Sequence, residues 1–120
     1  PDICATGGLS EAKKIATLAS CHGVEIVPHS WGTGIALSAA LHFLANLDIM
    51  PGRLKSPDCL MEFDRTENGL RDELTSSSMQ YKNGYIQISD SPGLGFELNE
   101  DALCKYSSKD PESELAKALA

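Results

Sequence analysis

Apolar runs of two kinds alternate along the first half of the chain, and this order limits the folds that the chain can adopt. Residues 24–28 are a short β-branched run, and residues 59–63 have a second strand-like composition. Around these runs, apolar residues recur three and four positions apart, as in a helix that buries one face. With residues 1–5 as the end of an earlier strand, the order is strand, helix, strand, helix, strand. This order is typical of parallel α/β structure.

Two helices are predicted between these strands. The first begins near Ser10, which can cap it, and stops before Gly23. Its apolar face consists of small residues, which allow a helix to lie close against a sheet. The second carries an apolar stripe from Leu37 to Leu47 and is closed by Pro51.

The second half of the chain changes character. An Asn83-Gly84 pair stands between two alternating runs, which predicts a β-hairpin. A loop rich in proline and glycine follows, and a short helix is expected from about Glu100. We divide the chain into residues 1–66, the last βα units of a barrel domain, residues 67–106, a hairpin, loop and helix segment, and residues 107–120, a polar tail with weak helical character.

These elements are too few to enclose a parallel sheet, whose strands need neighbours and cover on both faces. A complete eight-stranded α/β barrel takes about 250 residues, whereas this chain has 120. We therefore interpret the chain as the C-terminal portion of a TIM-like α/β barrel in a larger protein.

The composition argues against two classes of partner. The net charge is −7, and Lys13-Lys14 is the one place where two basic residues adjoin, so neither a nucleic acid nor a membrane surface is an expected partner. The longest apolar stretch, residues 34–47, is too short to span a bilayer. The four cysteines are widely spaced without a CxxC pair, which predicts reduced, mostly buried thiols in a cytoplasmic protein.

Polar side chains stand at or near the ends of all three predicted strands, at Asp2, His29 and Glu62. Active sites of α/β barrels lie at the C-terminal ends of the strands. Asp2 and His29 could form a hydrogen bond there, in which the carboxylate fixes the imidazole tautomer and favours the protonated ring. Glu62 could bind a substrate or act as an acid. These three are the candidate catalytic residues.

Each of them also has an ordinary structural interpretation. A histidine after a strand is usually structural, Asp2 alone would be a turn or cap residue, and Glu62 alone would be an ion-pair partner. Their position on three successive strand ends favours a site. His22 suits a helix C-terminus, and His42 lies on the polar ridge of a helix, so both are interpreted as structural.

The loop after His29 supplies the candidate substrate-binding residues Ser30, Trp31 and Gly32. Trp31 could form the wall of a ligand pocket or pack the loop against the barrel. No GxSxG motif surrounds Ser30, which argues against a hydrolase nucleophile. The short GTG and GLG motifs lack the context of a phosphate-binding loop.

The sequence resembles the C-terminal part of the mandelate racemase/muconate lactonizing group of the enolase superfamily, with the acid-sugar dehydratase branch most similar. Three stretches carry this resemblance: PDICATGGLSEAKKIATLASCHGVEIVPHSWGTGIALSAALHFLA, LMEFD and NGYIQISDSPGLGFELNEDALCKY. The resemblance covers residues 1–106. It implies a (β/α)7β barrel in which residues 1–66 run from the end of strand 6 to strand 8. The hairpin segment would then pack near an α+β capping domain.

The resemblance also implies a chemistry. Enzymes of this group bind a carboxylate substrate on Mg²⁺ and remove the proton α to the carboxylate. Asp2 and His29 match the family's dyad, with His29 as the general base, and Glu62 matches the glutamate that binds the substrate carboxylate. The family's metal ligands lie on earlier strands, so no metal ligand is expected among these residues. The 120 residues alone are expected to be inactive, and the full-length protein is expected to be a homo-oligomer acting on a small hydroxy acid.

Several alternatives stay open beside the acid-sugar dehydratase. A racemase or epimerase of the same group would share the His–Asp pair. A barrel remnant that binds a ligand or a subunit would be non-catalytic. A cycloisomerase of the same superfamily is disfavoured, because positions 4 and 6 are Cys and Thr and no strand-six lysine is visible.

Overall fold

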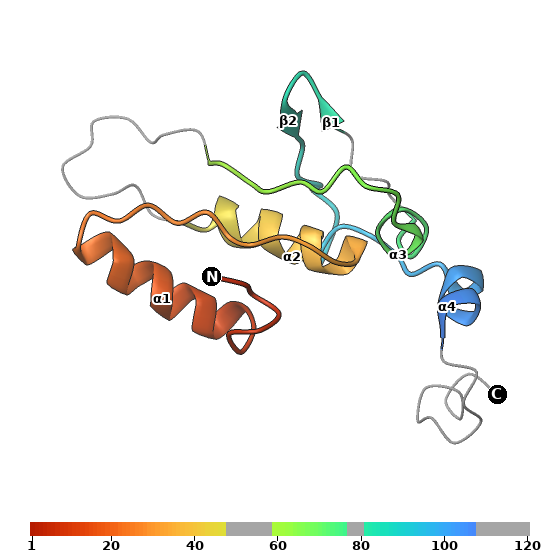
Figure 1. Cartoon of the computed structure of the whole chain (residues 1–120), viewed down its shortest axis with the longest axis horizontal. Helices are drawn as coiled ribbons and strands as arrows, with labels where there is room; N and C mark the ends of the chain where they lie inside the picture. Colours follow the sequence, from red (N-terminus) through yellow and green to blue (C-terminus); the bar gives the residue numbers. More distant parts are fainter. Residues whose placement is uncertain (48–58, 77–80, 108–120) are drawn as a thin grey trace.

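The computed structural model describes residues 1–47, 59–76 and 81–107. Four helices and one hairpin make up the regular structure of this part of the chain (Figure 1). In chain order the elements are α1 (Leu9–Cys21), α2 (Gly34–Ala45), α3 (Gly69–Asp72), β1 (Tyr81–Lys82), β2 (Tyr85–Ile86) and α4 (Glu100–Tyr106).

Helices α1 and α2 pack against each other and form the core. The buried cluster consists mainly of small residues from α1 and larger ones from α2, joined by one residue of the N-terminal turn: Ile3, Ala12, Ala16, Ala40, Phe43 and Leu44. Ile26 and Met61 pack on this cluster from two chain segments that run along α2, one before the helix and one from residue 59 onward. The predicted small apolar face of the first helix is thereby confirmed, because Ala12 and Ala16 are both buried.

The predicted strands at 24–28 and 59–63 are not strands in the structure. Within the described residues, strands occur in the β1–β2 hairpin alone, and the first half of the chain holds one isolated parallel bridge, between Asp2 and His29. The bridge includes a hydrogen bond of 3.0 Å from the His29 N–H to the Pro1 carbonyl. A strand requires several consecutive backbone hydrogen bonds, and a single bridge does not provide them.

The two segments nevertheless follow the course that a parallel arrangement requires. Figure 1 shows the segment before α2 and the segment from residue 59 onward both running along α2. Their ends meet where the Ser30 N–H donates to the Glu62 carboxylate. The α/β character of the domain is therefore visible in the path of the chain, while a barrel is not formed by the described residues.

The helix ends correct one prediction and confirm another. Helix α1 begins at Leu9 with Gly8 as its N-cap and has no side-chain cap, so Ser10 is not the capping residue. The reason is that Gly7 and Gly8 both have positive φ angles, which turns the chain into the helix earlier. Gly23, with a φ of 68°, follows the end of α1 as predicted. Helix α2 is capped by Thr33 and ends at Ala45, and the predicted stop at residues 51 and 52 lies outside the described residues.

The hairpin and α4 confirm the predictions for the second half. Strands β1 and β2 pair antiparallel with Tyr81 opposite Ile86, and Asn83 and Gly84 have φ angles of 53° and 84°. The Tyr81 ring stacks on Phe63 with centroids 5.9 Å apart, which holds the hairpin against the segment from residue 59. Helix α4 begins at Glu100, as predicted. The polar tail beyond residue 107 lies outside the described residues.

The described part of the chain contains all four cysteines. All four cysteines are free, as predicted, but all four are exposed, so the prediction of mostly buried thiols is wrong. Cys21 is the last residue of α1 and Cys104 lies in the short helix α4, where one side of each helix faces solvent. Among the described residues, no helix is both long and apolar enough to cross a membrane.

Candidate active site

His29 and Glu62 form the centre of the candidate site. His29 follows Pro28, whose side chain is fully buried, and its imidazole projects from that fixed point. The Nδ1 atom of His29 lies 2.8 Å from Oε2 of Glu62. The same carboxylate oxygen accepts a hydrogen bond of 3.1 Å from the Ser30 backbone N–H. The structure therefore brings together two of the three predicted catalytic residues, from segments 33 positions apart in the sequence.

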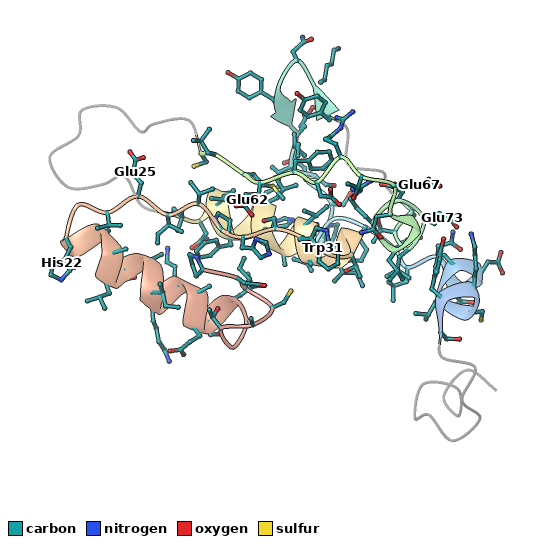
Figure 2. All side chains as sticks on the ribbon, in the orientation of Figure 1. His22, Glu25, Trp31, Glu62, Glu67 and Glu73 are labelled. Carbon is teal, nitrogen blue, oxygen red and sulfur yellow. The ribbon has the colours of Figure 1, made fainter. Side chains whose placement is uncertain are left out.

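The pair is accessible from solvent. The side chains of His29 and Glu62 are 56% and 54% exposed, so a solute can reach both. In Figure 2, Glu62 and Trp31 both lie along α2, whereas His22 lies at the far end of α1. An exposed imidazole beside a carboxylate can accept and return a proton, which is the arrangement that general base catalysis needs.

The electrostatics of the site favour an ionised Glu62. The Ser30 N–H lowers the pKa of the Glu62 carboxyl below its ordinary value, and the hydrogen bond with the His29 ring lowers it further. A carboxylate that stays ionised at neutral pH holds the proton of the imidazole on Nδ1. The other ring nitrogen, Nε2, then keeps its lone pair and can act as a base.

Asp2 lies beside His29, but its carboxylate binds within its own turn. Its backbone pairs with His29, but its carboxylate Oδ1 accepts a hydrogen bond of 2.8 Å from the Cys4 N–H. The Asp2 carbonyl accepts a second bond from the Thr6 hydroxyl. Among the described residues, no hydrogen bond joins the Asp2 carboxylate to the His29 ring. The reason is local, because an aspartate at the start of a turn satisfies the N–H two residues later.

The loop after His29 shows the three predicted substrate-binding residues in different environments. Ser30 is 5% exposed and its hydroxyl donates inward to the Pro28 carbonyl, at 3.3 Å. Trp31 is 68% exposed, so its indole stands outside the core. Gly32 has a φ of 148°, a conformation that side chains disfavour. Ser30 therefore offers its backbone N–H to this site, and Trp31 offers its ring.

A metal site is not assembled by these residues. Within the described part of the chain, no group of three or more His, Cys, Asp or Glu side chains is placed to hold a metal ion. A magnesium ion at this site would need ligands from elsewhere.

The short helix α3, which follows Glu62 in the chain and contacts the loop after His29, was not predicted from the sequence. Helix α3 begins after Asn68, whose side-chain oxygen accepts from the Arg71 N–H, and the Asn68 amide nitrogen donates to the Gly32 carbonyl. Arg71 binds the carboxylates of Asp64 and Asp72. An asparagine before a short run of helix-compatible residues is a helix-start signal, and it could have predicted α3. Nothing in the sequence pattern predicts the contact with Gly32.

The comparison with protein families matches residues 1–102 to the model of the enolase C-terminal domain-like family. The chain belongs to the enolase C-terminal domain-like family. The resemblance drawn from the sequence is thereby confirmed, and with it the α/β class of the domain.

Relatives in this enolase-like family are acid-sugar enzymes by name. The chain is 49% identical over 111 residues to a D-galactarolactone cycloisomerase from Agrobacterium fabrum, covering 92% of this chain and 29% of the relative. It is 33% identical over 108 residues to an arabinonate dehydratase from Saccharolobus solfataricus, covering 90% and 26%. The chain thus spans less than a third of the length of these relatives.

A solved structure gives the same result. The 3,6-anhydro-D-galactonate cycloisomerase from Zobellia galactanivorans superposes with a TM-score of 0.78 at 50% identity, over 91% of this chain and 28% of that chain. Two relatives near 50% identity are therefore cycloisomerases. The prediction that disfavoured a cycloisomerase is therefore not supported, since these two relatives are more identical to this chain than the arabinonate dehydratase is.

Proposed function

We propose that the protein is an acid-sugar enzyme that removes the proton α to a carboxylate and then releases the oxygen on the neighbouring β-carbon. The observation that carries the proposal is the exposed contact between His29 and Glu62. The named relatives support the substrate class, because they act on sugar acids or their lactone and anhydro forms.

In this proposal His29 is the general base. Glu62 accepts the Nδ1 proton and thereby directs Nε2 toward the substrate. The protonated ring can then return the proton to the departing oxygen. Asp2 stays in the proposal as a second carboxylate adjacent to the base, because the backbone bridge keeps its segment beside His29. The Trp31 ring and the backbone at Gly32 would contact the sugar chain.

Two outcomes of the same bond cleavage distinguish the candidate activities. In a dehydratase the β-oxygen belongs to a free hydroxyl and leaves as water, which gives a 2-keto-3-deoxy acid after tautomerisation. In a 3,6-anhydro sugar acid the oxygen on C3 belongs to the ring, so the same cleavage opens the ring without loss of atoms. The identity of about half to two cycloisomerases favours this second candidate. A racemase, which cleaves no C–O bond, stays as a secondary alternative.

Magnesium is part of the proposal. Members of the enolase superfamily generally use Mg²⁺, and the family match extends that expectation to this protein. A divalent cation supplies positive charge beside the substrate carboxylate, where negative charge develops when the α-proton leaves. The described residues do not hold such a group, so its ligands would lie outside them. A homo-oligomeric state and a cytoplasmic location stay predictions.

The test uses the full-length protein with its upstream sequence. We would incubate it with Mg²⁺ in D₂O with aldonates, aldarates, their lactones and a 3,6-anhydro acid, and follow the products by NMR and mass spectrometry. Loss of water identifies a dehydratase, an isomeric open-chain product identifies a cycloisomerase, and α-deuteration alone identifies a racemase. His29→Asn should abolish each reaction, while His22→Asn, at the end of α1, should not. A folded protein that binds Mg²⁺ but exchanges no α-proton in any of these acids contradicts the proposal.

A further inference from the structure

The loop that follows His29 is held in place by a residue from another part of the chain. The side-chain amide nitrogen of Asn68 donates a hydrogen bond of 3.3 Å to the carbonyl of Gly32. Gly32 has a φ of 148°, so this carbonyl belongs to a peptide in an uncommon conformation. The bond crosses 36 positions of sequence and joins the Trp31–Gly32 loop to the segment that carries Glu62.

The orientation of the Asn68 amide is determined by two partners. Its oxygen accepts from the Arg71 N–H at 3.3 Å and caps helix α3, and its nitrogen faces the Gly32 carbonyl. Rotating the amide by 180° would place oxygen against oxygen at Gly32 and nitrogen against N–H at Arg71. Asn68 therefore performs two tasks with its two polar atoms, and no other neutral side chain of this size offers a donor and an acceptor in the same geometry.

The segment on which Asn68 stands is itself fixed. The Arg71 side chain is 11% exposed and its guanidinium donates to the carbonyls of Asp64 and Thr66, at 2.7 Å each. Hydrogen bonding to the Asp72 carboxylate raises the pKa of Arg71, so the guanidinium stays charged. These bonds close the chain between Glu62 and α3 into a compact loop, and Asn68 lies within that loop.

We propose that Asn68 is a positioning residue that fixes the loop carrying Trp31 and Gly32 relative to the His29–Glu62 pair. The inference rests on the proposed function for its effect on catalysis, but the hydrogen bond can be tested without it. The side-chain hydrogen bonds of Asn68 go to the Gly32 carbonyl and the Arg71 N–H, so Asn68 acts on the loop through the Gly32 carbonyl. Its removal is expected to loosen substrate binding more than the proton transfer itself.

The decisive variant is Asn68→Asp in the full-length protein. Aspartate caps a helix as well as asparagine does, so α3 is retained, but it has no donor for the Gly32 carbonyl. Asn99→Asp is the matched control, because Asn99 caps α4 with the same geometry, its oxygen accepting from the Ala102 N–H. Asn68→Ser, which also caps, provides a neutral second variant.

Two measurements are made on each variant. Amide hydrogen exchange by mass spectrometry should show faster exchange of the peptide spanning residues 30–33 in Asn68→Asp, by about fivefold for a hydrogen bond worth about 1 kcal/mol. Peptides from α1 and α2 should be unchanged. On the substrate found for the full-length protein, KM should rise by a similar factor while kcat changes little. Asn99→Asp should match the wild type in both.

The outcomes separate the two proposals. Unchanged exchange at residues 30–33 in both Asn68→Asp and Asn68→Ser would overturn the positioning role, whatever the activity. A fall in kcat with unchanged KM would also overturn it, because that pattern would indicate a general structural defect. Absence of α-proton exchange in the wild type would instead overturn the proposed function, and the hydrogen-exchange result would still decide the role of Asn68.

Discussion

Glu62 is held by donors of two kinds, a backbone N–H and a side-chain ring. The Ser30 N–H contributes the larger effect on the carboxyl and the His29 ring the second, and both act on the same oxygen atom, Oε2. Because both donors stabilise the ionised form, Glu62 stays a carboxylate at the pH at which a histidine base works. Glu62 thereby fixes both the orientation of the His29 ring and the nitrogen that carries its proton.

The pKa of Glu62 is therefore expected to respond to His29. In the wild type its carboxyl should titrate below the ordinary value of 4.5. His29→Asn should raise the pKa toward that value without reaching it, because the Ser30 N–H is retained. Carboxyl ¹³C NMR shifts measured across the acid range would follow both titrations.

The lowered pKa of Glu62 also determines how the stability of the fold changes with pH. A pKa that is lower in the folded state stabilises the fold above the ordinary pKa, and the contribution is lost as the pH falls through the lowered value. His22→Asn is the control and should leave the Glu62 titration unchanged. A Glu62 titration that is identical in wild type and His29→Asn would show that the ring does not bind the carboxylate in solution.

Among single residues, the sequence located His29 and Glu62, which the structure brings together, but it did not predict that the two side chains bind each other. His29 and Glu62 were recognised because each interrupts or ends an apolar run, which needs no knowledge of distant contacts. Within the described residues the Asp2 carboxylate binds the Cys4 N–H and not the His29 ring, so the role of Asp2 stays a prediction. Local hydrogen bonds of aspartate compete with any long-range assignment.

Two of the helices meet at a place where a side chain would not fit. Helices α2 and α3 approach at Gly34, where an added Cβ would lie 2.8 Å from both the Arg71 carbonyl and the Thr75 hydroxyl. Gly69 differs, since its close neighbour is the hydroxyl end of the Tyr106 side chain, which can rotate away. Gly34 thus sets the spacing of α2 and α3 beside the loop that carries the site.

Gly34→Ala is expected to destabilise the protein despite its better helix propensity. The substitution gains up to about 1 kcal/mol of helix propensity, but an overpacked contact costs about 1–3 kcal/mol. We expect a net loss in the free energy of unfolding, measured by urea titration. Ser10→Ala, at the exposed start of α1, is the control and should change little. A more stable Gly34→Ala variant would mean that α3 can move away without cost.

The hairpin should depend on the two residues of its turn. Asn83 and Gly84 both have positive φ angles, so Gly84→Ala should weaken the hairpin by about 1 kcal/mol, whereas Asn83→Gly should preserve it. Loss of cross-strand NOEs between Tyr81 and Ile86 would report the change, as would the ring shifts of Phe63, on which Tyr81 stacks. Equal NOE intensities in the wild type and Gly84→Ala would contradict this prediction.

Helices α1, α2 and α4 and the hairpin were predictable because their signals are local. Periodicity located α1 and α2, and an Asn-Gly pair located the turn between β1 and β2. Strands at 24–28 and 59–63 could not be judged in this way, because a strand exists through partners elsewhere in the chain. The composition of these runs favours strands, but within the described residues their backbones find a single bridge, between Asp2 and His29.

At the scale of the whole molecule, apolar side chains are exposed along the two segments that run along α2. Val24, Val27, Trp31 and Leu60 are all more than two-fifths exposed. Exposed apolar side chains that gather on one surface usually mark a place that another part of a protein covers. The core cluster between α1 and α2 is small by comparison, with six buried members.

Residues 1–120 expressed alone are therefore expected to self-associate. Light scattering after size-exclusion chromatography should detect oligomers, and Leu60→Gln should reduce them. Leu18→Gln on α1 is a matched control, because the two leucines are 65% and 64% exposed. Equal effects of the two substitutions would mean that association depends on exposed apolar area in general and not on the segments that run along α2.

The backbone contact of Ser30 has an evolutionary consequence. The largest influence on the pKa of Glu62 comes from a main-chain N–H, which every residue except proline possesses. Natural selection on this contact would act on position 62 and not on the chemistry of position 30. Because Ser30 is buried, the side chain at this position must stay small, but several small residues could replace it without loss of the N–H. In the descent of this family, a carboxylate should persist at one end of the bond while the residue at the other end changes.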